Sequence, residues 1–198
     1  MTARLEALAA EIVRLQGELD REIEKQRTTL GWRLRAGLVE FEDGLVTQHR
    51  RFRQGMARFL GGASFGTVAT APVIYSLIIP LVLIDAWASL YQAVCFRAWG
   101  IVRAPRSHYV VLDRGRLAYL NGIEAVNCVF CEYANGVIAY VREIASRTEQ
   151  YWCPIKHALR ITDPHERYAR FLEYGDAEGY RARLEAFRVA LRTSAPEA

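Results

Sequence analysis

The central stretch 59-FLGGASFGTVATAPVIYSLIIPLVLI-84 decides the fold, because its 26 residues carry no charge. As an α-helix it would extend about 39 Å at 1.5 Å per residue, which exceeds the ~30 Å hydrocarbon core of a bilayer. Between Val73 and Ile84 every face of such a helix is apolar, which is unusual for a core helix of a soluble protein. We therefore predict a membrane-embedded segment over residues 59–104.

Prolines and flanking charges complicate a simple span. Pro72 and Pro80 kink or break helices. Basic residues lie on both sides of the block: Arg50, Arg51, Arg53 and Arg58 before it, and Arg97, Arg103 and Arg106 after it. Because basic flanks favour the cytoplasmic side, two interpretations stay open, a single helix or a tight helical hairpin turning near Pro80. The basic flanks give a single helix no clear orientation, whereas a hairpin or re-entrant element keeps both ends in the cytoplasm. We therefore expect the inner (cytoplasmic) membrane, with the soluble parts in the cytoplasm.

Asp85 interrupts the apolar run and has two interpretations. A charge inside a membrane is costly, so it can mark an intramembrane functional acid. Trp87 and Tyr91 follow closely, and such aromatic residues are typical of the membrane interface. We therefore favour an interfacial or capped aspartate over a functional acid.

The N-terminal residues 1–58 predict an amphipathic or coiled-coil helical arm. Its seam has the 3-4-3-4 spacing of a heptad and consists of Leu5, Leu8, Ile12, Leu15 and Leu19. A looser pattern of leucines continues through Leu30, Leu34, Leu38 and Leu45, with a break expected within Gln26–Gly31. Such a seam packs within the chain, binds a protein partner or self-associates, and the sequence does not choose among these.

A cysteine cluster predicts a metal centre in residues 105–192. Cys128 and Cys131 have Cys-x2-Cys spacing, and Cys153 and His157 follow after 21 residues with Cys-x3-His spacing. Three thiolates and one imidazole form a closed tetrahedral set, which is typical of structural zinc. We therefore predict a structural zinc site with these four ligands.

Other roles for the thiols stay open. Cys128 and Cys131 could exchange electrons as a dithiol, although no thioredoxin-like context surrounds them. Iron is a further alternative, but Glu132 stands where a c-type haem motif requires histidine. Pro154 favours the first position of a helix, so we expect Cys153 to be an N-cap thiolate with a lowered pKa.

The remainder of the cysteine region predicts a small α+β module. Alternating residues in Ser107–Asp113 and Arg116–Leu120 predict one β-hairpin. An apolar stripe predicts a helix over Tyr133–Trp152, and two C-terminal helices are expected, one over His165–Tyr174 and one capped by Asp176. Residues 193–198 should be disordered. The fold class is therefore mainly α, with this metal-binding module as its α+β part.

Composition narrows the class of protein. The chain has 198 residues, is 52% hydrophobic and carries a net charge of +4. The basic excess is thin and spread out, so we do not expect a nucleic-acid-binding protein. Four cysteines do not make a disulfide scaffold at this length, and Arg4, Glu6, Glu11 and Arg14 interrupt any secretory leader.

Three motifs resemble a family of uncharacterised bacterial membrane-associated proteins. They are 127-NCVFC-131, 133-YANGVIAY-140 and 147-RTEQYWCPIKH-157, and the similarity extends over roughly residues 70–180. The resemblance implies a bacterial, membrane-associated protein and no particular activity.

These features favour a membrane-anchored scaffold or adaptor with a structural zinc site. The alternative is a membrane-bound thiol redox or metal-handling protein that uses Cys128, Cys131 and Cys153. An enzyme with Asp85, Glu143 or Glu149 as acid or base is the least favoured, because no spacing argument supports it.

Overall fold

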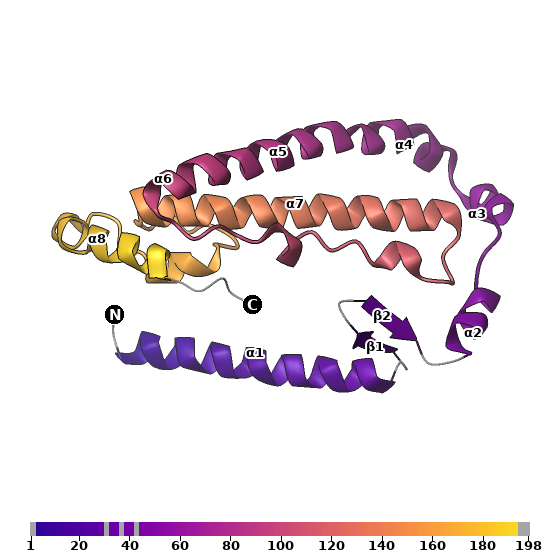
Figure 1. Ribbon diagram of the computed structural model, residues 1–198, viewed down its shortest axis with the longest axis horizontal. Helices are drawn as coiled ribbons and strands as arrows, with labels where there is room; N and C mark the ends of the chain where they lie inside the picture. Colours follow the sequence, from indigo (N-terminus) through magenta and orange to yellow (C-terminus); the bar gives the residue numbers. More distant parts are fainter. Residues whose placement is uncertain (1–2, 30–31, 36–37, 42–43, 194–198) are drawn as a thin grey trace.

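The computed structural model describes residues 3–29, 32–35, 38–41 and 44–193, and it is mainly helical, as predicted (Figure 1). In chain order the helices and strands are α1 Ala3–Thr29, β1 Trp32–Arg35, β2 Leu38–Phe41, α2 Leu45–Arg51, α3 Met56–Gly62, α4 Phe65–Ser76, α5 Ile78–Tyr91, the π-helical turn η1 Gln92–Phe96, α6 Arg97–Trp99, α7 Gly122–Trp152 and α8 Ala177–Thr193. Three short 3₁₀ turns complete them: η2 Arg106–His108, η3 Arg114–Arg116 and η4 Glu166–Arg170.

The apolar block forms one long helical rod from α4 to α6. Ser64 begins it, because its hydroxyl accepts a hydrogen bond from the backbone N–H of Thr67 at 3.2 Å. Pro80 lies in the first turn of α5, where a backbone N–H has no partner within the helix. Its missing N–H therefore costs no helical hydrogen bond, and the rod continues through it. The helical hairpin turning near Pro80 is therefore wrong, and Phe65–Trp99 is one continuous helical stretch of 35 residues.

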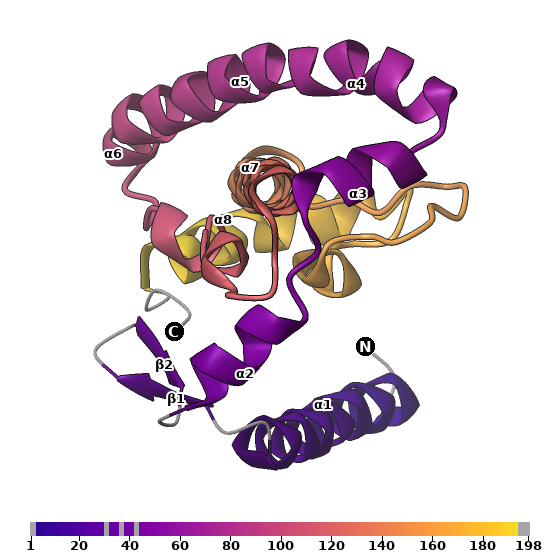
Figure 2. The ribbon, with the colours of Figure 1, turned by 90° about the vertical axis from the view of Figure 1, so that its right-hand side faces the viewer.

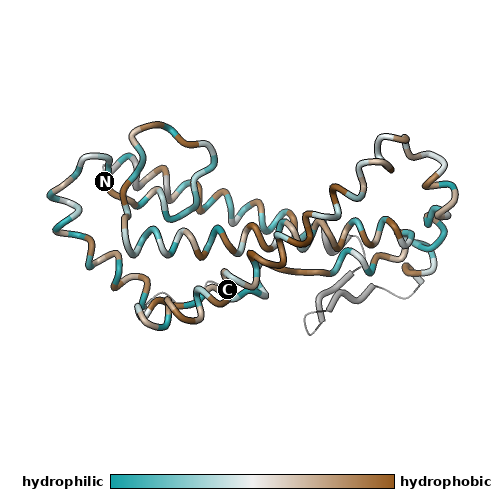
Figure 3. The backbone as a smooth tube through the Cα atoms, turned by 90° about the horizontal axis from the view of Figure 1, so that it is seen from above, coloured by the Kyte–Doolittle hydropathy of each residue, from teal (hydrophilic) through white to brown (hydrophobic). Residues whose placement is uncertain are grey.

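This rod arches over α7. Figure 2 looks along α7 and shows α4, α5 and α6 curving above it, with α1, α2 and both strands on the opposite side of α7. From above, the rod crosses α7 obliquely (Figure 3). The closest packing joins α5 to α7, and α8 packs on the end of α7.

An extended strap, residues 101–121, returns from the rod to the start of α7. Gly100 ends α6 with a left-handed φ of 71°, and Asn121 and Glu124 form a capping box that begins α7. Gly136 lets the strap approach α7 closely, since a Cβ there would lie 2.7 Å from the carbonyl oxygen of Tyr109.

The β-hairpin predicted over residues 107–120 is wrong. This part of the strap forms the turns η2 and η3 instead. The carboxylate of Glu132, on α7, accepts hydrogen bonds from the backbone N–H groups of Asp113 at 3.2 Å and Arg114 at 2.8 Å. Those two groups are therefore satisfied by a side chain of α7 rather than by a partner strand.

The N-terminal arm begins with the predicted helix, but its second half differs from the prediction. α1 is a single helix of 27 residues that ends at Thr29, inside the range where a break was expected. Of the looser leucine pattern, Leu34 and Leu38 lie in strands, Leu45 begins α2, and Leu30 lies outside the described residues. β1 and β2 pair antiparallel there, with Trp32 opposite Phe41 and Arg35 opposite Leu38.

The C-terminal region confirms one of its two predicted helices. Asp176 lies immediately before α8, and its carboxylate accepts a hydrogen bond from the N–H of Gly179 at 2.8 Å. The helix predicted over His165–Tyr174 is wrong, because only the short turn η4 forms there. Beyond that turn, Leu172 pairs with Ile155 in a parallel bridge. Of the tail predicted to be disordered, Thr193 is the last residue of α8, and residues 194–198 lie outside the described residues.

The hydrophobic core lies where α5, η1, α7 and α8 meet. Its most deeply buried side chains are Phe96, Tyr140, Ile144 and Leu191, each at most 3% exposed. An aromatic cluster extends this core at the end of the rod, where Trp99 stacks on Tyr151 with ring centroids 5.3 Å apart. The core therefore fixes the α6 end of the rod on α7 and α8.

Candidate functional site: an apolar helix face

Large apolar side chains are exposed along the length of the rod, most of them on the side away from α7. We call this set the apolar face: Val73, Ile74, Leu77, Ile79, Val82, Leu83, Ile84, Trp87, Leu90 and Val94. Leu83 is 65% exposed and Trp87 is 73% exposed. The rod is long and apolar enough to cross a membrane, and none of its most apolar window is buried within the chain. A contiguous patch of this kind on a protein surface usually marks an interaction site.

The inner side of the same rod carries polar side chains beside the buried core residues Ala88 and Phe96. Asp85 and Gln92 are buried there, and both face α7 and the strap. Asp85 accepts hydrogen bonds from Arg106 Nε at 2.9 Å, from Arg106 Nη2 at 2.7 Å and from the hydroxyl of Tyr133 at 2.9 Å. The aspartate is therefore paired inside the protein, with one side chain of the strap and one of α7.

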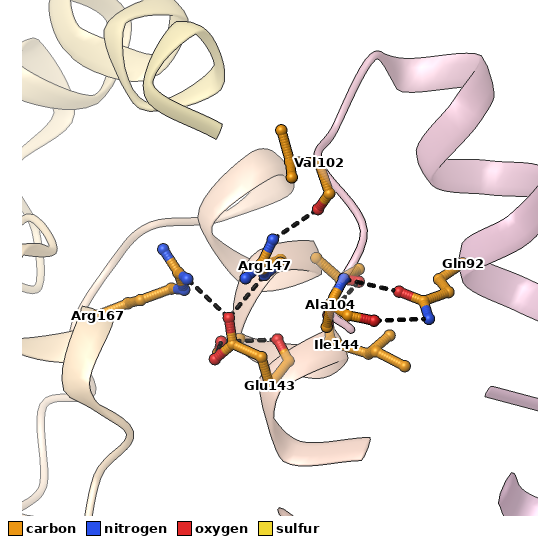
Figure 4. Close-up of polar contacts among 9 residues, drawn as sticks. Gln92, Val102, Ala104, Glu143, Ile144, Arg147 and Arg167 are labelled. Atoms are coloured by element: carbon orange, nitrogen blue, oxygen red, sulfur yellow. Dashed lines mark hydrogen bonds and ion pairs between the residues drawn. The ribbon is translucent and has the colours of Figure 1, made fainter. Parts of the chain in front are cut away.

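Gln92 binds the strap as a peptide group would (Figure 4). Its Nε2 donates to the carbonyl oxygen of Ala104 at 3.2 Å, and its Oε1 accepts from the N–H of Ala104 at 3.0 Å. Nε2 also contacts the hydroxyl of Tyr140. The wider π-helical turn η1 begins at Gln92 and ends at Phe96, and both residues are buried.

Further polar contacts follow the rod, and we call the whole set the polar seam. Near the α4 end, the hydroxyl of Tyr75 donates to the side-chain oxygen of Asn127. Toward α6, the hydroxyl of Tyr91 lies 3.0 Å from that of Thr148. The rod thus turns its buried polar side chains inward and leaves large apolar side chains exposed, whereas a surface helix of a soluble protein turns its polar face to solvent.

A second buried ionic cluster holds α7 to its neighbours (Figure 4). Glu143 Oε1 lies 2.6 Å from Arg147 Nε and 2.7 Å from Arg167 Nη2. Arg147 also donates to the carbonyl oxygen of Val102 at 2.6 Å. Burial alone would raise the pKa of Glu143, but hydrogen bonds from Arg167 and Arg147 lower it below its ordinary value.

Glu143 and Glu149 were the remaining acid/base candidates, and both have structural partners. Glu143 lies in the ionic cluster, and Glu149 Oε2 lies 2.8 Å from His165 Nε2. These contacts account for both carboxylates as links between α7 and the segment that follows it.

The structure does not bring the four predicted zinc ligands together. Cys128 and Cys131 lie in the first third of α7, whereas Cys153 follows its last residue. The 22 positions from Cys131 to Cys153 correspond to about 33 Å of helix, far beyond the reach of one metal ion. His157 contacts Tyr168 instead, and within the described residues no group of three or more metal-binding side chains forms. The four-ligand arrangement predicted from the sequence is therefore corrected.

Cys153 also differs from its prediction. It ends α7 as the C-cap, with its N–H donating to the carbonyl oxygen of Glu149 at 2.8 Å, and begins no helix. Burial raises the pKa of its thiol, and the nearby charge of Glu149 raises it further. The predicted lowering of this pKa is therefore wrong. Cys95 is half-buried in the π-helical turn.

Sequence reasoning missed the polar seam, although a signal for it was present. Asp85, Ser89 and Gln92 recur at spacings of four and three, which places all three on one side of a helix. Tyr133 and Tyr140, seven residues apart, lie on one side of α7 in the same way and contact Asp85 and Gln92 respectively.

No protein family model, curated protein or solved structure matches this chain. The resemblance to a bacterial membrane-associated family thus stays a prediction.

Proposed function

We propose that this protein is a membrane-docked scaffold. The apolar face of the rod enters lipid, while α7, α8 and the strap form the body behind it. The observation that carries the proposal is the exposed apolar face of the rod: Asp85 and Gln92 are buried inward, while Leu83 and Trp87 are mostly exposed. Polar groups directed inward and apolar groups directed outward are the arrangement that a lipid environment favours.

Energetic reasoning supports lipid as the environment of this face. Burial of one Val, Leu, Ile or Phe side chain is favourable by about 1.5–3 kcal/mol relative to exposure. The ten side chains of the apolar face forgo much of that gain in water. Insertion of the apolar face into lipid provides this free energy of burial and leaves the contacts of the polar seam unchanged.

The adaptor part of the proposal rests on α1. Leu8, Ile12, Leu15 and Leu19 are each at least 49% exposed, so most of the surface of this seam stays open to a partner. Arg14 bridges Glu11 and Glu18 and leaves the seam itself apolar. An exposed heptad seam of this length suits a helix from a partner or from a second copy of the chain.

The thiol redox and metal-handling alternative gains no support from the geometry. Cys128 and Cys131 share one end of α7 and Cys153 lies at the other. Exposed arginines on both sides of the apolar face, among them Arg53, Arg58, Arg97 and Arg103, support the proposed location at the cytoplasmic face of the inner membrane.

Flotation with lipid vesicles tests the proposal. The wild-type protein, diluted from detergent, is expected to float with vesicles. Leu83→Asp places a charge on the apolar face, which costs about 2 kcal/mol and so lowers the partition coefficient roughly thirtyfold. Because Leu83 is mostly exposed, the fold should tolerate this change.

Ala145→Asp is the matched control, because Ala145 is exposed on α7 and lies outside the apolar face. It should float like the wild-type protein. A wild-type protein that stays with the soluble fraction, or equal losses for both variants, would contradict membrane docking by this face.

A further inference from the structure

We propose that the rod α4–α6 lies in the plane of the membrane and enters a single leaflet, rather than crossing the bilayer. This inference rests on the proposed membrane docking and specifies its geometry. It rests on the polar seam and the charged strap, which lie beside the rod along most of its length.

The polar seam accompanies the rod too far for a crossing helix. Its contacts run from Tyr75 through Asp85 to Gln92, which corresponds to about 25 Å of helix. That distance nearly equals the ~30 Å hydrocarbon core. In a crossing orientation the ion pair of Asp85 and Arg106 would therefore lie deep in the bilayer, together with the strap that carries Arg106.

Exposed charges on the strap make such an orientation costly. Arg103, Asp113 and Arg116 are all exposed, and the strap runs beside α7 under the rod. Charged side chains in the hydrocarbon core are strongly unfavourable, because no water solvates them there. A crossing rod would bring several of these charges toward the hydrocarbon, whereas a rod lying flat leaves them in water.

The arrangement of the molecule fits a flat rod. The arch presents its convex side away from α7, and α1, α2 and both strands lie on the opposite side (Figure 2). Only the apolar face then needs to enter lipid, to the depth of about 5–10 Å that interfacial helices reach. The 35 residues of the rod extend about 52 Å, which is much longer than a crossing requires.

The basic residues near the two ends agree with this geometry. Arg53 and Arg58 precede the rod, Arg97 lies in its last turns and Arg103 follows it, and all four are exposed. A flat rod places both groups at the headgroups of the same leaflet. A crossing rod would place them on opposite sides of the membrane.

Side-specific labelling tests the orientation. The full chain, with its four native cysteines replaced by alanine, receives one cysteine at either end of the rod, as Gly62→Cys or Ala98→Cys. Both positions are exposed. The protein is added to preformed sealed vesicles of phosphatidylcholine and phosphatidylglycerol, floated, and treated with a membrane-impermeant maleimide.

A flat rod predicts that both ends label equally before and after detergent lysis. A Leu83→Cys variant in the same background should label only after lysis, because that residue lies in lipid. If one end labels only after lysis, the rod crosses the bilayer and the in-plane inference is overturned while membrane docking stands. If Leu83→Cys labels fully on vesicles, or the protein does not float, docking itself fails and the in-plane inference fails with it.

Limited proteolysis of the wild-type protein repeats the test without any substitution. Arg53 precedes the rod, and Arg160 lies beyond the far end of α7, and both are exposed and outside helices. Trypsin added outside the vesicles is expected to cleave after both residues. Protection of either site until lysis would overturn the inference.

Discussion

Gln92 is a single side chain that holds an extended segment against a helix. Its amide pairs with both the N–H and the carbonyl group of Ala104, a residue that is only 2% exposed. Buried backbone groups need partners, and no strand of the described residues pairs with the strap at this point to supply them. The glutamine amide offers both donor and acceptor atoms, so it satisfies both groups at once.

Gln92→Leu should therefore destabilise the fold strongly. Both polar groups of Ala104 would lose their partner, at about 1–3 kcal/mol for each buried unsatisfied group. We expect a lower midpoint of chemical unfolding in detergent, corresponding to a loss of about 2–6 kcal/mol in the free energy of unfolding. Gln54→Leu is the control, because Gln54 is exposed and its change should stay within about 0.5 kcal/mol of the wild-type stability. Similar midpoints for the two variants would refute the role given to Gln92.

At the scale of elements, periodicity predicted the helices better than their connections. The apolar spacing in α1 and in α7 predicted a helix in both places, because each pattern lies within one helix. The apolar run Val110–Leu112 was misread as part of a strand, because α7 satisfies the polar groups that follow it through Glu132. The cysteine motifs misled for a related reason: spacing does not reveal that one unbroken helix separates Cys131 from Cys153.

The exposed seam of α1 predicts self-association on a membrane. Docking raises the local concentration of the arms, so a seam of about three heptads can pair there although it is marginal in solution. Ile12→Asp with Leu15→Asp should reduce cross-linked dimers on vesicles at least about fivefold, because about 1 kcal/mol is lost on introducing charge into the seam. Val13→Asp should leave them unchanged, since Val13 is exposed outside the seam. If the wild-type protein forms no dimers on vesicles, self-association through this seam is refuted.

At the scale of the whole molecule, the two sides of α7 pack against different parts of the chain. The rod covers one side of α7, with its apolar face exposed, while the ionic cluster around Glu143 joins α7 to the strap and to η4. That cluster joins three segments distant in sequence, because Arg147 reaches Val102 on the strap and Arg167 lies on η4. The packing of α7 against the strap and η4 therefore depends in part on the ionised carboxylate of Glu143.

This dependence predicts a loss of stability in acid. The pKa of Glu143 is lower in the folded protein than its ordinary value of 4.5, so between these two values the unfolded chain binds more protons. The stabilisation is therefore fully present above pH 4.5 and is lost as the pH falls through the folded pKa. Urea unfolding of the wild-type protein in a non-ionic detergent should show a free energy of unfolding that declines from pH 7 to pH 3.

Glu143→Gln should have a lower free energy of unfolding at pH 7 and a shallower decline in acid. The control Glu178→Gln, at an exposed position of α8, should decline like the wild-type protein. If the stability of Glu143→Gln declines in acid as steeply as that of the wild-type protein, protonation of Glu143 is not the cause of the decline.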